Sequence, residues 1–280
     1  MRADDMLQGV RGLVPARLVP GLVRRRVRGV WADPLYRARH EAEMEFLLGC
    51  SERAGEVPEL ARAYTEQGML RTWMRWQPRA ITRQEVRGAE WLTSRRDLSR
   101  PLVLSFMHHA RYDGMFASLA RHGADLRILT LADALEADAP TQIRQHVRVV
   151  RRGGTMLPTT GGTGAVLAAL QPGVTLAIAS DVAGQTPVEF LGRRVLGSSG
   201  AARIAVATDS PVVLVTSHRE GEGHYLQVHP PLEPSAFGGW EELLAEILSR
   251  HGEAVLAWPE ALDNPLHRWG ALEAETVTYA

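Results

Sequence analysis

The sequence predicts an α/β fold in which helices flank a mostly parallel central sheet and a helical subdomain precedes it. From residue 101 onward, short apolar runs alternate with segments of helical periodicity, as in successive βαβ units. Residues 35–95 instead carry apolar side chains at helical spacing. A chain of 280 residues with 45% hydrophobic content can bury a large core. We therefore expect a helical, basic N-terminal segment (1–95) packed on an α/β core (96–280).

The expected elements of the core follow from these patterns. Apolar runs rich in Val, Ile and Leu predict strands at residues 101–107, 125–131, 174–180 and 211–217. The valine-rich VRVVRR (147–152) and the alternating HYLQVHP (224–230) are also predicted to be strands. Helical spacing predicts helices at 111–123, 132–146, 160–173, 198–209 and 238–251. Segment 181–197 contains Gly and Pro without a continuous apolar run, so it is predicted to be a loop.

Composition excludes several classes of function. The single cysteine, Cys50, excludes a disulfide framework and a Cys-based zinc site. The histidines are scattered, so no metal site is expected. The basic residues are 32 arginines without a lysine, which excludes Schiff-base chemistry, and the formal net charge of +0 gives no reason to expect DNA binding. A cytoplasmic location is the default expectation.

The N-terminal 30 residues are strongly basic. They hold seven arginines against two aspartates, interspersed with Leu and Val: Arg2, Arg11, Arg17, Arg24, Arg25, Arg26 and Arg28 against Asp4 and Asp5. No run is long enough to span a membrane. Two interpretations remain open. The segment either lies on the anionic inner face of the plasma membrane or forms a packed helical hairpin with a solvated basic face.

The strongest candidate site is the run His108-His109-Ala110-Arg111-Tyr112-Asp113-Gly114, between a predicted strand and a predicted helix. In parallel α/β sheets, ligands bind beyond the carboxyl ends of the strands. With His108 at the strand end and Asp113 in the first helical turn, the carboxylate can orient the imidazole as a general base. The competing interpretation is that Asp113 caps the helix and the histidines are structural.

This run resembles the motifs of two families. It fits the His-His-x-x-x-Asp-Gly of peptide-synthetase condensation domains, in which the second histidine, here His109, is the base. It also fits the His-x4-Asp of the lysophospholipid acyltransferase superfamily, which implies His108 as the base and Asp113 as its partner. Condensation domains are much longer than this chain.

The second resemblance extends over roughly residues 95–270. It includes the opening PLVLSFMHHARYDG, the pair Ser180-Asp181, the run Val188-Glu189-Phe190-Leu191-Gly192, a small-residue helix from Gly200, and the ending AWPEALDNPLHRW. These resemble the late lipid A acyltransferases and the actinobacterial phosphatidylinositol mannoside acyltransferases. The resemblance implies a glycerolipid-acyltransferase-like fold. Phe-Leu-Gly replaces the usual Phe-Phe-Gly, Asp181-Val182 replaces Asp-Gln, and the usual N-terminal membrane helix is replaced by the arginine-rich segment.

We therefore expect an acyltransferase that moves an acyl group from acyl-CoA or an acyl carrier protein to a hydroxyl or amine of a glycolipid or natural-product intermediate, with no bound cofactor. The expected catalytic residues are His108, Asp113 and Glu189. The expected substrate-binding residues are His109, Arg111, Arg151, Arg152, Asp181, Arg193 and Arg194, since arginines suit phosphate groups. An amide-forming condensation enzyme using His109 and a catalytically silent lipid-binding protein remain the alternatives.

Overall fold

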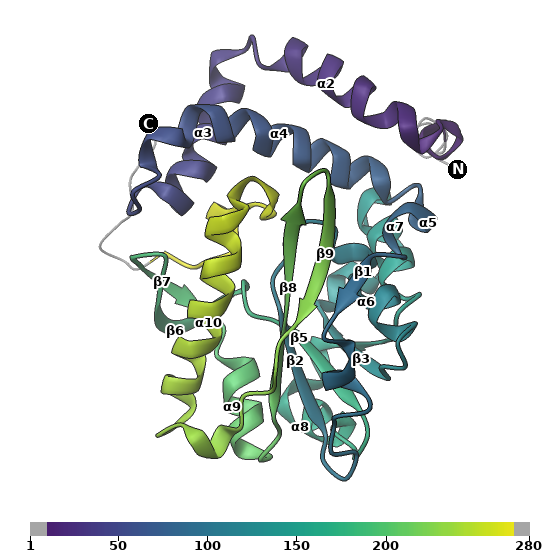
Figure 1. Cartoon of the computed structure of the whole chain (residues 1–280), viewed down its shortest axis with the longest axis vertical. Coiled ribbons are helices and arrows are strands. Elements are labelled where there is room, and N and C mark those ends of the chain that lie inside the picture. The colour runs from purple at the N-terminus through teal and green to yellow at the C-terminus, as the bar shows by residue number, and fades with distance from the viewer. Residues whose placement is uncertain (1–9, 272–280) are drawn as a thin grey trace.

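A seven-stranded sheet occupies the centre of the computed structural model, which describes residues 10–271 (Figure 1). The strand order is β1-β9-β8-β2-β5-β3-β4. Strands β8, β2, β5, β3 and β4 run parallel to one another. Strand β9 runs antiparallel to β8, and the edge strand β1 pairs with β9 in parallel. The strands are β1 (Glu85–Arg87), β2 (Leu102–Phe106), β3 (Leu126–Thr130), β4 (Thr155–Pro158), β5 (Thr175–Ala179), β8 (Val212–Glu220) and β9 (Gly223–Val228). The predicted mostly parallel sheet is confirmed.

Helices cover both faces of the sheet and its carboxyl edge (Figure 1). Those of the core are α6 (Tyr112–Ala120), α7 (Thr141–Val150), α8 (Gly162–Ala169), α9 (Gly200–Ala207) and α10 (Trp240–Ala257). The N-terminal helices are α2 (Val19–Val30), α3 (Pro34–Leu48), α4 (Val57–Met74) and α5 (Pro78–Ile81), preceded by the short 3-10 helix η1 (Val10–Leu13). Alternation along the strands divides the core between the two faces. Val103 packs in the cluster that contains the α10 leucines, whereas Leu102 and Leu104 pack with Phe116 of α6.

The N-terminal helices lie across the carboxyl edge of the sheet (Figure 1). Val19, Val23 and Val27 repeat at the four-residue spacing that places side chains on one helix face, and all three are buried in a cluster with Met74 of α4 and Val149 of α7. This valine face attaches α2 to the rest of the molecule. Arg2, Asp4 and Asp5 of the strongly basic N-terminal 30 residues lie outside the described residues.

Two predicted elements of the core were wrong. Residues 147–152 do not form a strand, because α7 continues through the β-branched run and buries Val147 and Val150, which are three residues apart on one helix face. Segment 181–197 is a β-hairpin, β6 (Ala183–Phe190) and β7 (Arg193–Gly197), rather than a loop. Its two-residue turn places both Leu191 and Gly192 at positive φ, 51° and 77°. A leucine in that conformation is uncommon, which hides the turn from a reading of the sequence.

A buried hydrogen-bonded chain joins three core elements beneath the carboxyl edge. Ser105 Oγ of β2 lies 2.7 Å from Ser180 Oγ, directly after β5, and 2.8 Å from His251 Nε2 on α10. All three side chains are buried, and burial lowers the pKa of His251 to about 3, so its imidazole is neutral. Because water does not reach these three side chains, their polar atoms have only one another as hydrogen-bond partners in this chain of contacts.

We expect Ser105→Ala to lower the free energy of unfolding by about 1–3 kcal/mol, because His251 Nε2 and Ser180 Oγ would lose a buried partner. Urea denaturation measures the change. Ser99→Ala is the control, since its hydroxyl is exposed and bonds only to nearby Asp97. A Ser105→Ala protein as stable as this control would show that the chain contributes nothing to the fold.

Candidate active site

A tight turn between β2 and α6 holds the histidine motif. Ala110 adopts a positive φ of 54°, and its N–H donates to the carbonyl of Ala261 at 2.9 Å. Gly114 allows α6 to begin there, because a Cβ at this position would lie 2.0 Å from the carbonyl oxygen of Ile81. The turn leaves His108 just beyond the carboxyl end of β2, where the sequence predicted it.

His108 is held by Asp181. The Nδ1 atom of His108 lies 2.8 Å from Asp181 Oδ1, and the His108 backbone N–H donates to Asp181 Oδ2 at 2.9 Å. Asp181 follows β5, the neighbour of β2 in the sheet, and its side chain is fully buried. Although burial alone would raise the pKa of Asp181, His108 and Arg268 hold it below its usual value, so the group is a carboxylate. The expected hydrogen bond between Asp113 and His108 is replaced by this one.

Asp113 points instead toward α4 and α7. Arg75 Nε donates to both of its carboxylate oxygens, at 3.1 and 3.2 Å, and His146 Nδ1 contacts Oδ1. The side chain is 1% exposed, and although burial acts to raise its pKa, Arg75 and His146 bring the pKa well below the usual range. Because Asp113 stands in the first turn of α6, its carboxylate faces α7 rather than the strand end. The Asp113 carboxylate therefore pairs with the buried guanidinium of Arg75 and does not orient His108.

The second ring nitrogen of His108, Nε2, is available to accept a proton. With Nδ1 engaged by Asp181, no partner for Nε2 occurs among the described residues, and the side chain is 16% exposed at the wall of a cavity. The ring packs edge-on against Tyr112, with centroids 4.7 Å apart. Burial lowers the pKa of His108 below its ordinary value, although the Asp181 carboxylate acts in the opposite direction. A neutral, oriented imidazole of this kind can accept a proton.

The cavity has a volume of about 820 Å³ and spans the carboxyl ends of the strands and the N-terminal helices. Its inner part, next to the sheet, is apolar and is lined by Phe106, Phe116, Ile128, Val150, Met156 and Ile178. Its outer part is polar and aromatic and is lined by Arg11, Arg26, Tyr36, His40, Tyr64 and Trp73. His108 lines the same cavity. The space therefore suits a molecule with one apolar and one polar portion.

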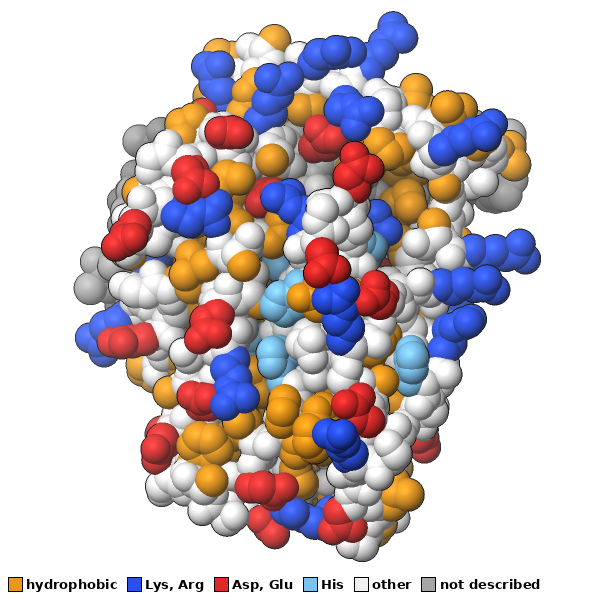
Figure 2. All heavy atoms as spheres, viewed as in Figure 1, with side chains coloured by type: hydrophobic (Ala, Val, Ile, Leu, Met, Phe, Trp, Pro, Cys, Tyr) orange, Lys and Arg blue, Asp and Glu red, His pale blue; other side chains and the backbone are white. Residues whose placement is uncertain are grey.

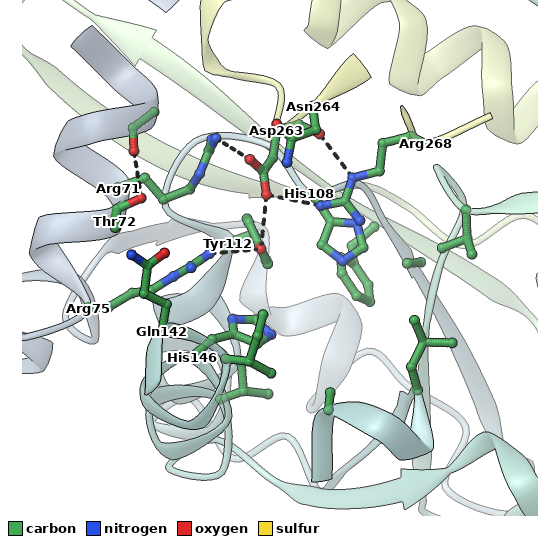
Figure 3. Close-up of a pocket in the computed structure, with 18 of the residues that line it drawn as sticks. Arg71, Thr72, Arg75, His108, Tyr112, Gln142, His146, Asp263, Asn264 and Arg268 are labelled. Atoms are coloured by element: carbon green, nitrogen blue, oxygen red, sulfur yellow. Dashed lines mark hydrogen bonds and ion pairs between the residues drawn. The ribbon is translucent and has the colours of Figure 1, made fainter. Parts of the chain in front are cut away.

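A carboxylate from the C-terminal segment organises the cavity wall beside His108 (Figure 3). Asp263 is paired with Arg71 of α4 and with Arg268, whose Nη2 lies 3.0 Å from Asp263 Oδ2. Arg268 Nε also lies 3.8 Å from Asp181 Oδ2. The backbone N–H of Asp263 donates to the carbonyl of His108 at 2.9 Å. The C-terminal segment is thus joined to both members of the His108–Asp181 pair.

His109 and Arg111 of the motif do not line this cavity. His109 is 4% exposed, its Nε2 lies 2.8 Å from the carbonyl oxygen of Trp258, and burial lowers its pKa to about 4. It therefore holds the C-terminal segment rather than a substrate. Arg111 faces the other way, close enough to His224 of β9 to lower that residue's pKa after the larger effect of burial. The structure thus places neither His109 nor Arg111, both predicted to bind substrate, in the wall of the cavity that His108 lines.

Glu189, predicted to be catalytic, lies on β6 in a second groove of about 850 Å³ between the β6–β7 hairpin and α10. Its side chain is exposed and does not line the cavity of His108. Arg194 stands opposite it on β7, and Arg193 donates to the carbonyls of Glu45 and Phe46 on α3. The hairpin therefore does not place any of these three residues, all predicted to belong to the site, in the cavity of His108.

Arg151 and Arg152 are exposed at the C-terminal end of α7 and do not line the cavity either. They were assigned to substrate binding on the expectation that residues 147–152 form a strand ending at the site. Instead, α7 continues through Val150, which lines the cavity with His146, and Arg151 and Arg152 follow the end of the helix with exposed side chains.

The sequence reading missed five residues of the site, namely Arg71, Arg75, His146, Asp263 and Arg268. A signal existed for some of them. Arg71 and Arg75 are four residues apart and so share a helix face. Asp263 and Arg268 fall within the ending AWPEALDNPLHRW, whose resemblance was recognised without roles for its side chains. Nothing local distinguishes His146, which reaches Asp113 only because α7 packs beside α6.

Residues 10–271 lack two features, a metal-binding cluster and a membrane-spanning helix. In that part of the chain, no group of three or more His, Cys, Asp or Glu side chains is arranged to hold a metal ion. None of its helices combines the length and apolar character needed to cross a bilayer.

Comparison with known proteins agrees with the resemblance found in the sequence. Comparison with curated proteins gives no significant match. Among solved structures, the chain is similar to the 1-acyl-sn-glycerophosphate (LPA) acyltransferase PlsC from Thermotoga maritima, with 17% identity and a TM-score of 0.42 over 89% of this chain and 96% of that one. The model of the bacterial lipid A biosynthesis acyltransferases matches residues 55–262, well over half of the chain. The chain therefore belongs to the bacterial lipid A biosynthesis acyltransferase family and is an acyltransferase.

Proposed function

We propose that the protein transfers an acyl group from a thioester, acyl-CoA or acyl carrier protein, to a hydroxyl or amine acceptor, with His108 as the general base. The observation that carries this proposal is the bond between His108 Nδ1 and Asp181, which leaves Nε2 facing the cavity. Asp181 fixes the tautomer in which Nδ1 carries the proton and Nε2 accepts one. It takes the role that the sequence suggested for Asp113.

In the proposed reaction, Nε2 of His108 removes the proton of the acceptor O–H or N–H as that atom attacks the thioester carbonyl carbon. A new C–O or C–N bond forms, and the tetrahedral intermediate collapses with cleavage of the C–S bond. The imidazolium then returns its proton to the departing thiolate. The Asp181 carboxylate stabilises the imidazolium between these steps. No acyl-enzyme is required.

The shape of the cavity supports this division of substrates. The apolar inner part lies beside the strand ends and offers an environment for an acyl chain, whereas the outer part offers Arg, Tyr and His side chains for a polar acceptor or for the carrier of the thioester. The acceptor is proposed to be a glycolipid or a natural-product intermediate. A condensation reaction that uses His109 is not proposed, because that imidazole is buried against the carbonyl of Trp258.

His108→Ala is expected to lower the rate of acyl transfer at least about 10²-fold, since a general base contributes 10²–10⁴-fold. For the unmodified protein, kcat/KM should fall as the pH drops through the pKa of His108. Because burial lowers that pKa, the midpoint should lie below the ordinary value of about 6.5. Release of free thiol from acyl-CoA in the presence of an acceptor measures both.

A His108→Ala protein that retains more than about a hundredth of the rate would contradict the proposed base. Absence of any transfer or hydrolysis above background in the unmodified protein, across acyl-CoA and acyl carrier protein donors, would favour the silent lipid-binding alternative.

Asp181→Asn and Asp113→Asn should differ in kind. Asp181→Asn is expected to reduce kcat roughly 10²-fold or more while the protein stays folded, because the amide NH₂ faces Nδ1 and favours the wrong tautomer. Asp113→Asn should mainly lower stability, by about 3–5 kcal/mol, because it leaves the buried guanidinium of Arg75 without its counter-charge. Kinetics at saturating substrate and urea denaturation of both variants separate the two roles. The reverse pattern would restore Asp113 as the partner of His108.

We further propose that the N-terminal helices contact an anionic membrane on its cytoplasmic side. The valine face of α2 is packed inward, but Leu13, Leu18, Leu22 and Leu35 are 42–83% exposed on the same end of the molecule. Arg25 and Arg28 are exposed beside them. In Figure 2, arginine side chains crowd the upper edge, where Figure 1 places α2. Exposed leucines among arginines suit insertion at a lipid surface.

Arg25→Gln/Arg28→Gln should weaken binding to phosphatidylglycerol vesicles roughly thirty-fold, since each arginine near such a surface contributes about 1 kcal/mol. Co-sedimentation at low salt measures the change. Arg95→Gln/Arg121→Gln is the matched control, because it removes the same charge from exposed positions outside α2. Equal binding by both double variants, or no binding by the unmodified protein, would contradict the contact.

A further inference from the structure

The outer wall of the catalytic cavity is built by a part of the chain that lies outside the family match. The match covers residues 55–262, whereas Arg11 of η1 and Arg26 of α2 both line the cavity from before its start. The family's shared chemistry therefore does not account for them. Their place in the cavity raises the question of what two further guanidinium groups would contact there.

The charges on the cavity wall are unbalanced. Five arginines line it, Arg11, Arg26, Arg71, Arg75 and Arg268, against one carboxylate, Asp263. Arg71 and Arg268 share that carboxylate, and Arg75 is paired with Asp113 behind the wall. Within residues 10–271, Arg11 and Arg26 have no carboxylate within ion-pair distance. Two positive charges thus face one cavity without a counter-charge in the described part of the chain.

Arg11 is fixed in position rather than free in solvent. Trp73 Nε1 of α4 donates to the Arg11 carbonyl at 3.2 Å, and the Arg11 guanidinium lies over the Trp73 ring, 5.6 Å from its centroid. Burial lowers the pKa of Arg11, and the nearby Arg26 lowers it further. Repulsion between two such groups is relieved by an anion placed between them.

We propose that Arg11 and Arg26 form a subsite for the phosphate ester of a substrate bound in this cavity, an inference that rests on the proposed acyl transfer. A phosphate monoester carries close to two negative charges, and guanidinium groups match phosphate oxygens with paired hydrogen bonds. This chemistry occurs in two substrates of the reaction, the 3′-phosphate of coenzyme A and a phosphorylated acceptor headgroup. The subsite replaces the arginine cluster that the sequence placed at residues 151–152 and 193–194.

The wall beside the subsite leaves room for such a group. Gly68 of α4 lines the cavity, and no atom lies within 4 Å of where its Cβ would be. Gly68→Ala should therefore be accepted without steric conflict, whereas Gly68→Met would extend a side chain from the cavity wall and reduce the space for a bound group. Alanine and methionine are both good helix formers. The two variants therefore test whether a ligand fills this space without changing any charge in the cavity.

The test is calorimetric titration of the full chain with three probes, namely coenzyme A, 3′-dephospho-coenzyme A and inorganic phosphate. Arg11→Gln and Arg26→Gln are each expected to weaken binding of a phosphate probe roughly tenfold or more, because a charge-assisted contact is lost. Arg24→Gln is the matched control on α2, since Arg24 faces Glu66 at 3.8 Å outside the cavity, and it should stay within twofold. Gly68→Met should weaken the same probe and Gly68→Ala should not.

The probes distinguish the two sources of phosphate. If Arg11→Gln and Arg26→Gln weaken binding of coenzyme A but have little further effect on 3′-dephospho-coenzyme A, the 3′-phosphate of the coenzyme occupies the subsite. If only inorganic phosphate depends on the two arginines, the subsite serves the acceptor. If no probe depends on them, or Arg24→Gln has the same effect, the subsite is refuted. Titrations with His108→Ala keep this outcome separate from catalysis, because that variant should bind normally even though it does not turn over.

Discussion

The active site depends on the register between β2 and β5. Phe106 pairs with Ala179 at the carboxyl end of the two parallel strands. His108 and Asp181 each stand two residues beyond that pair, so equal extensions of neighbouring strands bring the imidazole and the carboxylate together. A shift by one residue would turn one of them to the opposite face. The buried chain of Ser105, Ser180 and His251 joins the same two strand ends to α10, directly below the site.

Two buried carboxylates connect the N-terminal helices to this sheet edge. Asp113 is paired with Arg75, the C-cap residue of α4, and Asp263 is paired with Arg71 of α4, so both arginines bind residues of the core. Buried ion pairs gain little net stability over apolar packing, but each partner is costly to leave unpaired. These ion pairs therefore determine the position of α4 on the core more than they add to the free energy of unfolding. Apolar packing of the α2 valines and of Met44, Leu47 and Leu48 of α3 supplies the attachment.

The sequence predicted the part of this arrangement that is local. The apolar runs at residues 101–107 and 174–180 give β2 and β5, and the expectation that His108 stands at a strand end was correct in position. The partner of His108 could not be read from the motif spacing. Which carboxylate reaches Nδ1 depends on the neighbouring strand, 73 residues away in sequence, rather than on the five-residue step to Asp113. Asp181 was noticed as a strand-end acid but was given another role.

The remaining misplacements have a common physical cause. Two segments that hold predicted site residues, 147–152 and 181–197, differ in secondary structure from the prediction. Because α7 continues through Val150 and β6 and β7 form a hairpin, none of the five residues placed by these segments lines the cavity of His108: Arg151, Arg152, Glu189, Arg193 and Arg194. The hairpin turn depends on Leu191 at positive φ, a conformation that composition does not reveal.

The cavity thus joins two parts of the chain with different tasks. The groups that we propose for proton transfer stand on strand ends whose register is fixed by the sheet, and they lie in the region shared with the family. The outer wall comes from helices held by valine packing and by two ion pairs, and residues 10–48 of it lie outside the family match. Changes in that wall can alter which polar group enters without disturbing the His108–Asp181 pair. In the proposed reaction, the sheet positions the groups that transfer the proton, and the N-terminal helices shape the space that an acceptor or donor headgroup would enter.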